Sequence, residues 1–459
     1  MTMSIVHQTS KPVTPLIVLH AADAAAGIAR LAAPARAWLS ANDFKAKAGQ
    51  WIAVPDASGG LKCIVAAVED ADDVYGLSAL PFALPAGCYA LSADGAPLNP
   101  GAAVLGWGLG AYEFARYRKP RTPATLVIAD SPAVQRAKAT VAATAAVRDL
   151  VNTPAEDMGP QHLSDAARAL AGAHGARFRE IAGEDLLQEN FPAIHAVGRA
   201  SHRPPRLIEL EWGDPSHPRI AMVGKGVCFD TGGLDIKTAD GMRQMKKDMG
   251  GAANALGMAQ LIMALNLPVR LHLVIGAVEN AIAGNAYRPG DIVPTRKGLM
   301  IEIGNTDAEG RVVLSDAIAF AAESKPQLLI DFATLTGAAR VALGPELPAT
   351  YANDDAWFAK LDAASKQTGD PLWRMPLWQP YNAMIKSSIG DIVNTGGPQA
   401  GSVTAALFLE HFVPRDQAWI HIDLFAWTPK AKPGRPEGGE AQTLRAVVRM
   451  LENEFAAKP

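Results

Sequence analysis

Beyond residue 151 the chain alternates between short apolar runs and longer segments with a helical pattern, and this alternation strongly constrains its fold. The apolar runs have the length and composition of buried β-strands. They are 207–212, 219–223, 270–278, 300–303, 327–332 and 419–424, and the helical segments are 160–173, 252–265, 314–324 and 402–412. Strands separated by helices favour an α/β fold with a largely parallel central sheet covered by helices on both faces.

The part of the chain before residue 131 has the same character on a smaller scale. Apolar runs at 16–19, 50–54 and 63–68 alternate with alanine-rich stretches. Residues 133–150 are alanine-rich and free of Gly and Pro, which predicts a long helix that Pro154 follows. We therefore expect an N-terminal α/β domain (1–130), a connecting helix (131–150) and a larger catalytic α/β domain (151–459).

The composition excludes several classes of protein. The net charge of −3 gives no extended basic field for nucleic acid or for a membrane surface. The apolar stretch at 15–19 is too short for a secretory signal, and no run of about 18 apolar residues could form a membrane span. The cysteines Cys63, Cys88 and Cys228 form no disulfide or metal-binding pattern, which predicts a reducing compartment. We expect a cytoplasmic protein that binds neither membranes nor nucleic acid.

Residues 305–311, Asn-Thr-Asp-Ala-Glu-Gly-Arg, form a dense polar cluster between an apolar run and a helical run. In an extended segment, side chains two residues apart share one face. On that geometry Asp307, Glu309 and Arg311 would point the same way at the end of a strand. Such charges on one short loop indicate a site for divalent cations.

A second polar cluster follows the apolar run at 219–223 and contains Lys225, Asp230, Lys237 and Asp248, with glycines at 224, 226, 232, 233, 250 and 251. The glycines let the backbone pass close to a site. A phosphate-binding P-loop is excluded because no GxxxxGK[ST] pattern is present. Parallel strands end at the same edge of a sheet, where α/β proteins bind ligands, so we expect this cluster to meet the one at 305–311.

The charges of the two clusters fit two divalent metal ions. Four carboxylates without cations would repel one another and some would take up protons. The carboxylates are Asp230, Asp248, Asp307 and Glu309. Any one of them alone is better explained as a surface carboxylate, but two glycine-rich clusters together favour a metal site. The oxygen-rich donors suit Mn²⁺, Mg²⁺ or Zn²⁺, and two such ions can activate a water and polarise a carbonyl.

The sequence blocks around these residues resemble the leucyl aminopeptidases, the M17 family of metallopeptidases. The signature-like block is 305–316, and further matching blocks are 148–154, 223–226, 229–233, 245–251, 333–338 and 391–397. The resemblance is strong over about 146–428, whereas before residue 131 only 109–112 resembles the family.

The resemblance implies a ligand set and two catalytic residues. One metal would be held by Lys225, Asp230, Asp248 and Glu309, and the other by Asp230, Asp307, Glu309 and the Asp307 carbonyl. The ions would be Mn²⁺ or Zn²⁺, with Mg²⁺ or Co²⁺ as further options, and a lysine ligand must be neutral. Lys237 would stabilise the oxyanion that forms on the scissile carbonyl. Arg311 would hold a bicarbonate-like anion, and this anion would act as the general base.

The resemblance also implies a substrate and an assembly. A water bridging the two metals would attack the first peptide carbonyl of a peptide with a free N-terminus. A fairly apolar pocket would suit Leu or Met, and the Leu335 N–H would contact the carbonyl side of the substrate. The residues matching the family's pocket are Met245, Asn305, Ala308 and Thr334. Family members form hexamers, which implies a homohexamer here.

The segment after the strand at 419–424 departs from the family pattern. The family has a Gly-Thr-Ala-Trp-like segment there, whereas this chain has Phe425-Ala-Trp427 followed by Thr428-Pro-Lys430. Two alternatives remain open beside the aminopeptidase. A two-metal phosphoesterase could use Lys237 and Arg311 as a phosphate clamp, and some family members have a secondary DNA-binding regulatory role.

Overall fold

The computed structural model describes residues 4–456 and divides into two compact units. Unit 1 comprises residues up to 145 together with 430–437, and unit 2 comprises 146–429 and the chain from 438 onward. The short segment 430–437 thus belongs to unit 1 although it lies far along the sequence.

Unit 1 is a small α/β unit with a six-stranded sheet in the order β1-β6-β5-β2-β4-β3. Only the β4–β3 pair is antiparallel; the other neighbours are parallel. Buried apolar residues form a core cluster on each side of strands β2 and β4. The elements are β1 (Ile5–Val6), β2 (Val13–His20), β3 (Trp51–Pro55), β4 (Leu61–Val68), β5 (Cys88–Leu91), β6 (Thr125–Val127), α1 (Ala24–Arg30), α2 (Ala33–Ala41), α3 (Leu80–Ala83) and α4 (Pro100–Gly110).

Helix α5 (Pro132–Asn152) is the long alanine-rich helix expected from the sequence, and the boundary between the two units falls within it. Its alanines carry good helix propensity. Val141 of this helix packs closely on α4, where a Cβ on Gly108 would lie 2.5 Å from Val141 Cγ2. No helix in residues 4–456 is both long and apolar enough to span a membrane. The three cysteines are buried and free.

Unit 2 is built on an eight-stranded sheet in the order β15-β14-β17-β13-β9-β10-β8-β7. Its four central strands run parallel, as expected, and antiparallel pairings at β10–β8, β8–β7 and β17–β14 widen the sheet. The strands are β7 (Arg177–Ala182), β8 (Arg206–Trp212), β9 (Arg219–Asp230), β10 (Arg270–Asn280), β13 (Leu328–Ala333), β14 (Ala349–Ala352), β15 (Trp373–Arg374) and β17 (Trp419–Asp423).

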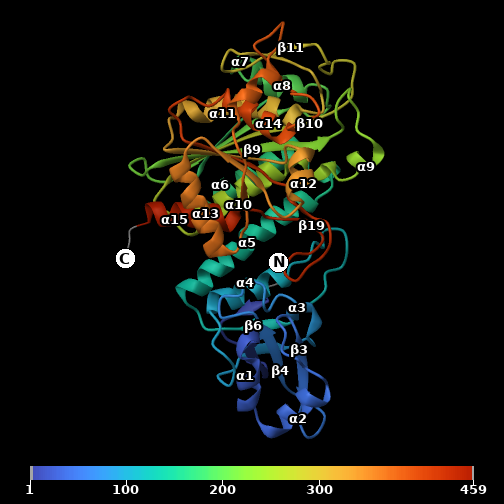
Figure 1. The fold of residues 1–459 in the computed structure, drawn as a ribbon, viewed down its shortest axis with the longest axis vertical. Coiled ribbons are helices and arrows are strands. Elements are labelled where there is room, and N and C mark those ends of the chain that lie inside the picture. The colour runs from blue at the N-terminus through green and yellow to red at the C-terminus, as the bar shows by residue number, and fades with distance from the viewer. Residues whose placement is uncertain (1–3, 457–459) are drawn as a thin grey trace. The chain divides into compact units, whose positions relative to one another are not determined.

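Helices cover both faces of this sheet (Figure 1). On one face α10 (Gly250–Ala264) packs on β9 and β13, and α6 (Pro160–His174) lies beside it. On the other face α11 (Glu309–Glu323) and α8 (Pro192–Gly198) pack on β9 and β10. The further elements of unit 2 are α7 (Asp185–Gln188), α9 (Ala239–Met242), α12 (Gly337–Leu343), α13 (Asp355–Thr368), α14 (Gly401–Glu410), α15 (Leu444–Phe455), β18 (Trp427–Thr428) and β19 (Gly438–Gly439).

Two expectations about the strands that carry polar residues need correction. Strand β9 continues to Asp230, so Lys225 lies inside the strand rather than beyond its end. Strand β12 (Met300–Glu302) belongs to a separate three-stranded sheet with β11 (Ile292–Pro294) and β16 (Ile392–Val393), not to the central sheet. The two polar clusters therefore do not meet as neighbouring strand ends of one sheet.

Two glycines let the start of α10 approach the strand backbones closely. A Cβ on Gly224 of β9 would lie 2.6 Å from the Cα of Ala252, and a Cβ on Gly251 would lie 2.1 Å from the Phe332 carbonyl oxygen. These separations are shorter than real contacts, and the clashing atoms are backbone, so neither position accepts a side chain without movement of α10 or β13. The glycines thereby fix the position of the segment that precedes α10.

The variant Gly251→Ala should therefore destabilise the protein, because its methyl group would overlap β13. We expect the free energy of unfolding to fall by about 1–3 kcal/mol, measured by chemical denaturation. The matched control is Gly172→Ala in α6, whose Cβ would meet nothing within 4 Å. The control should gain stability by up to about 1 kcal/mol from helix propensity. Equal stability of the two variants would contradict the packing argument.

Candidate metal centre

Lys225 lies within β9 and its ammonium contacts two carboxylates from other segments. Its Nζ is 2.7 Å from Asp248 Oδ2 and 2.9 Å from Glu309 Oε1, and it donates to the Thr334 carbonyl at 2.8 Å. The side chain is 2% exposed. Burial opposes the charge, but the carboxylates of Asp248 and Glu309 outweigh it and raise the pKa of Lys225 above its usual range. The strand thus places a nitrogen donor between two buried acids.

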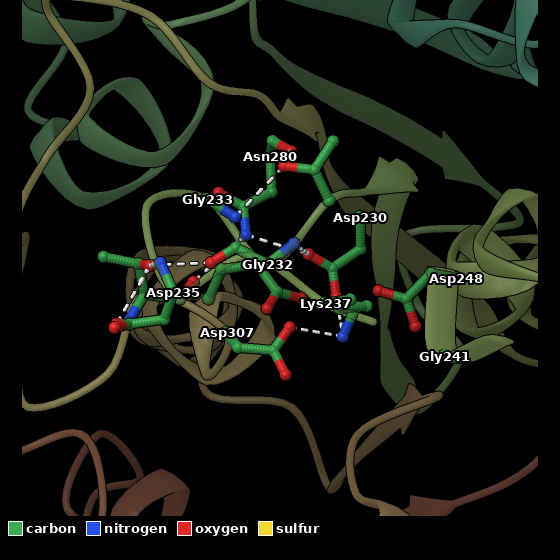
Figure 2. A network of polar contacts seen from close by, with 12 residues as sticks. Asp230, Gly232, Gly233, Asp235, Lys237, Gly241, Asp248, Asn280 and Asp307 are labelled. Carbon is green, nitrogen blue, oxygen red and sulfur yellow. Dashed lines mark hydrogen bonds and ion pairs between the residues drawn. The ribbon is translucent and has the colours of Figure 1, made fainter. Parts of the chain in front are cut away.

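Asp230, the last residue of β9, is held in place by two hydrogen bonds. Its Oδ1 accepts from the Gly232 N–H and from Asn280 Nδ2, both at 2.8 Å (Figure 2). Its Oδ2 lies 2.8 Å from Lys237 Nζ. Gly232 has a φ of +88°, a conformation that glycine adopts without strain. The backbone of the turn after β9 therefore donates a hydrogen bond to the carboxylate of Asp230, the residue at the end of the strand.

Besides Asn280, whose Nδ2 donates to the Thr306 carbonyl at 3.0 Å, the loop that carries Asp307 is held by the buried amide of Asn394. Its Oδ1 accepts from the N–H groups of Gly304 (2.8 Å) and Asn305 (3.2 Å). Its Nδ2 donates to the carbonyls of Asn305 (2.7 Å) and Ala308 (3.2 Å). Four hydrogen bonds from one fully buried side chain fix the backbone of this loop.

Helix α11 begins at Glu309, so the expectation that Asp307, Glu309 and Arg311 share one face of an extended segment is wrong. Asp307 precedes the helix, and Glu309 lies at its first position, where the helix dipole favours a negative charge. Arg311 lies deeper in the helix, and its Nη1 donates to the Asn394 carbonyl at 2.9 Å. The residues still gather, because a loop and a helix start direct them rather than a strand.

Lys237 bridges the two clusters. Its Nζ contacts Asp230 and also hydrogen-bonds to Asp307, as Figure 2 shows. Burial opposes its charge, but the negative charges of Asp230 and Glu309 outweigh it, and the pKa of Lys237 is raised. Lys237 therefore stays charged at neutral pH.

The four carboxylates repel one another, and this repulsion contributes to raised pKa values for two of them. Burial, followed by the charge of Asp230, raises the pKa of Glu309 to about 8. The same two causes, in the same order, raise the pKa of Asp307. The four carboxylates and the two ammonium groups of Lys225 and Lys237 leave a formal charge of −2 in a largely buried volume. An excess of buried negative charge is the condition that a bound cation relieves.

The donor atoms suit divalent cations. Oxygens of Asp230, Asp307 and Glu309 lie within 4.8 Å of one another. Asp248 Oδ2 and Glu309 Oε1 contact Lys225 but accept no hydrogen bond of regular geometry from residues 4–456. Buried carboxylate oxygens with unused lone pairs are good ligands for hard and borderline cations. The predicted ligands Lys225, Asp230, Asp248, Asp307 and Glu309 are thus brought to one place.

The residues expected to line the substrate side lie around this cluster, but three of them have structural contacts. Asn305 Oδ1 accepts from the Asp307 N–H at 2.7 Å. Thr334 Oγ1 donates to the Asp248 backbone carbonyl (2.8 Å) or to its Oδ1 (2.9 Å). The Leu335 N–H, expected to face the substrate, donates to Asp423 Oδ1 at 3.1 Å. Met245 and Ala308 are half-buried and apolar.

Inspection of the sequence missed several residues that build this site. Asn280 and Asn394 hold the ligand-bearing segments, and Asp423 accepts from the N–H groups of Leu335 and Thr336. Asn394 lies in the polar block 391–397, which was a usable signal, whereas Asp423 is flanked by Ile422 and Leu424 within an apolar run. Lys247 was also missed: it is 6% exposed, and burial lowers its pKa to about 8. Lys246 and Lys247 are adjacent in the sequence, and no pattern there indicates which of the two is buried.

Comparison with known proteins places the chain near a single family. The model of the cytosol aminopeptidase catalytic domain matches residues 145–448, and that of the M17 aminopeptidase N-terminal domain matches 14–129. The second match extends the resemblance into the part where inspection found only 109–112. A probable cytosol aminopeptidase of Syntrophotalea carbinolica is 42% identical over 381 residues, which cover 78% of this chain and 76% of that protein.

Solved structures agree with the sequence comparison. The cytosol aminopeptidase of Coxiella burnetii has a TM-score of 0.93 and 46% identity, covering 98% of this chain and 99% of its own. The bottromycin maturation enzyme BotP in complex with Mn has a TM-score of 0.87 and 32% identity, covering 97% of this chain and 100% of its own.

Binding of a divalent cation should release protons, because Glu309 and Lys225 both have raised pKa values in the metal-free protein. At pH 7 both groups hold a proton that a bound ion must displace, so we expect release of about two protons. Affinity should accordingly increase as the pH rises from 6 to 8. Titration calorimetry with Mn²⁺ in buffers of different ionisation enthalpy measures the number released. Binding without proton release would contradict this assignment.

Proposed function

The chain belongs to the cytosol aminopeptidase family, and on that premise we propose that it uses two divalent metal ions to release the N-terminal residue of peptides. The observation that supports the proposal is the convergence of Asp230, Asp307 and Glu309, whose oxygens lie within 4.8 Å of one another. Lys225 and Asp248 adjoin this group through ion pairs of less than 3 Å.

In the proposed site, Asp230 and Glu309 would serve as ligands to both ions. Lys225 and Asp248 would complete one ligand set, and Asp307 would complete the other with its carboxylate and its carbonyl. When bound, the ions would supply an activated water and polarise the scissile carbonyl. Mn²⁺ is supported by the related BotP complex with Mn, and Zn²⁺, Mg²⁺ and Co²⁺ are compatible with the same donors.

Lys237 is proposed to stabilise the negative charge that develops on the carbonyl oxygen. Its ammonium is largely buried, stays charged and contacts two of the metal-binding carboxylates. A hydrogen-bond donor held in place before the reaction is worth most in such a water-poor site. Lys237 can therefore act without the cost of reorganising its surroundings.

Arg311 is proposed to hold a bicarbonate-like anion that serves as general base. The guanidinium is 7% exposed, and burial lowers its pKa to about 10, so it remains charged at neutral pH. One nitrogen donates to Asn394, whereas its buried Nε has no hydrogen-bond partner within residues 4–456. A buried donor without an acceptor supports a small anion as its missing partner.

The substrate side and the assembly remain predictions. Met245 and Ala308 offer apolar surface, which suits an N-terminal Leu or Met. Homohexamer formation and a cytoplasmic location follow from the family resemblance.

The decisive experiment compares two chromogenic substrates on the Mn²⁺-loaded protein. We expect turnover of leucine p-nitroanilide and no significant turnover of p-nitrophenyl phosphate. Phosphate turnover without amide turnover would replace the aminopeptidase by the phosphoesterase alternative. Dialysis against a chelator should abolish activity, and re-addition of Mn²⁺ should restore it.

The variant Glu309→Ala should lose metal, because it removes a carboxylate shared by both ions. We expect fewer than two ions per chain by elemental analysis and a loss of activity of at least about 100-fold. The control is Glu323→Ala, which removes the partly exposed carboxylate paired with Arg296 at the other end of the same helix. Two ions retained in Glu309→Ala would overturn the ligand assignment.

The variant Lys237→Ala should separate catalysis from metal binding. Loss of one oxyanion donor lowers kcat by about 10²–10³-fold, and the metal content should stay at two ions per chain. Lys366→Ala, which removes an exposed ammonium paired with Asp362, serves as the control. Unchanged kcat in Lys237→Ala would exclude the oxyanion role.

A further inference from the structure

Lys247 is a buried cation without an internal partner. The side chain is 6% exposed, and its ammonium makes no hydrogen bond or ion pair with any residue in the described part of the chain. Its one close contact is the ring of Phe425, whose centroid lies 4.8 Å from Nζ. An aromatic face stabilises a cation only in part and accepts no full hydrogen bond. The ammonium therefore lacks a full set of acceptors among these residues, and a ligand carboxylate could supply them.

The carboxylates nearest to Lys247 are already paired with other cations. Asp248 pairs with Lys225 at 2.7 Å. Asp423 pairs with Arg340 at 3.4 Å and also accepts from two backbone N–H groups. Binding of a divalent cation to Asp248 would leave still less negative charge for Lys247. Beside Lys225 and Arg340, whose ammonium and guanidinium are paired, Lys247 is therefore the cation of this corner that forms no ion pair with a residue in 4–456.

The surroundings hold Lys247 beside the metal centre. It belongs to the 3-10 helix η3 (Met245–Met249), between Met245 on the substrate side and the ligand Asp248. Its backbone N–H donates to the Gln244 carbonyl at 2.9 Å. The Phe425 N–H donates to Gln442 Oε1 at 2.8 Å. Both partners of the cation–ring contact are thus fixed by their backbones, and Phe425 lies in the segment that departs from the family pattern.

We propose that Lys247 determines the side-chain preference of the enzyme by pairing with the carboxylate of an acidic N-terminal residue. The inference rests on the proposed function and replaces its Leu or Met preference. Met245 and Phe425 would contact the apolar stem of the substrate side chain, and the ammonium would donate hydrogen bonds to its carboxylate. A Leu side chain would displace water from Lys247 and leave its donors unpaired.

The test compares glutamate p-nitroanilide and leucine p-nitroanilide on the Mn²⁺-loaded full-length protein. We expect kcat/KM of the wild type to be at least tenfold higher for the glutamate substrate. In Lys247→Met this value should fall by about tenfold or more for glutamate, the effect of one lost charged hydrogen bond, while leucine turnover is kept or increased. Lys247→Gln, which retains a neutral donor, should lie between the two.

Lys246→Met is the matched control, because the ammonium of this adjacent lysine has an acceptor in the Asn152 carbonyl at 2.6 Å. Its glutamate-to-leucine ratio should equal that of the wild type. The metal content of each variant shows that the centre is intact. If Lys247→Met does not fold, the wild-type ratio decides alone.

A substrate carboxylate could also come from the C-terminus of a dipeptide, which the p-nitroanilides lack. Leu-Gly and Leu-Gly-amide distinguish this source: if Lys247→Met impairs only Leu-Gly, the side-chain assignment is overturned. A wild type that prefers leucine tenfold, or an equal loss for both anilides, also overturns it. Turnover of neither anilide would instead overturn the proposed function, and this inference with it.

Discussion

The confinement of four carboxylates to one largely buried volume is the constraint on which the rest of unit 2 depends. Such charges repel and must be balanced by cations. The chain supplies Lys225 from inside a strand and Lys237 from the following loop, and the remaining negative charge suits metal ions. The close approach of α10 to the sheet at Gly251 then fixes the segment that carries Asp248.

Neutral amides and hydroxyls keep these charged groups in position. Asn280 holds Asp230, Asn394 holds the loop before α11, and Thr334 holds Asp248. Each donates a hydrogen bond without adding charge, so the balance between carboxylates and cations is not disturbed. This explains why the site needs more buried polar side chains than its ligands alone.

Much of the fold could be predicted from the sequence, because local patterns determine it. The alanine-rich run that became α5 and the apolar runs that became β8, β10 and β13 needed no tertiary information. Segments whose structure depends on partners could not be predicted. Strand β9 extends to Asp230 because β10 pairs with it to the end. The run at 300–303 pairs with β11 and β16 in a small separate sheet. The hydrophobic periodicity of the sequence does not indicate which strands pair with each other.

The candidate site shows the same division. Its charged members were visible as polar clusters between apolar runs, and the structure brings them together. The reason given for their meeting was wrong, because Glu309 starts a helix instead of continuing a strand. The absence of a partner for Lys247 could not be predicted, since it depends on the pairing of Asp248 and Asp423 with other cations.

The four hydrogen bonds of Asn394 have a consequence for how such a site can change over evolutionary time. They fix the backbone between Gly304 and Ala308, so an insertion or deletion in this loop would move a metal ligand. The side chains of Lys247 and Phe425 take no part in these hydrogen bonds. Substitution of either side chain can therefore alter substrate range without moving the Asp307 loop.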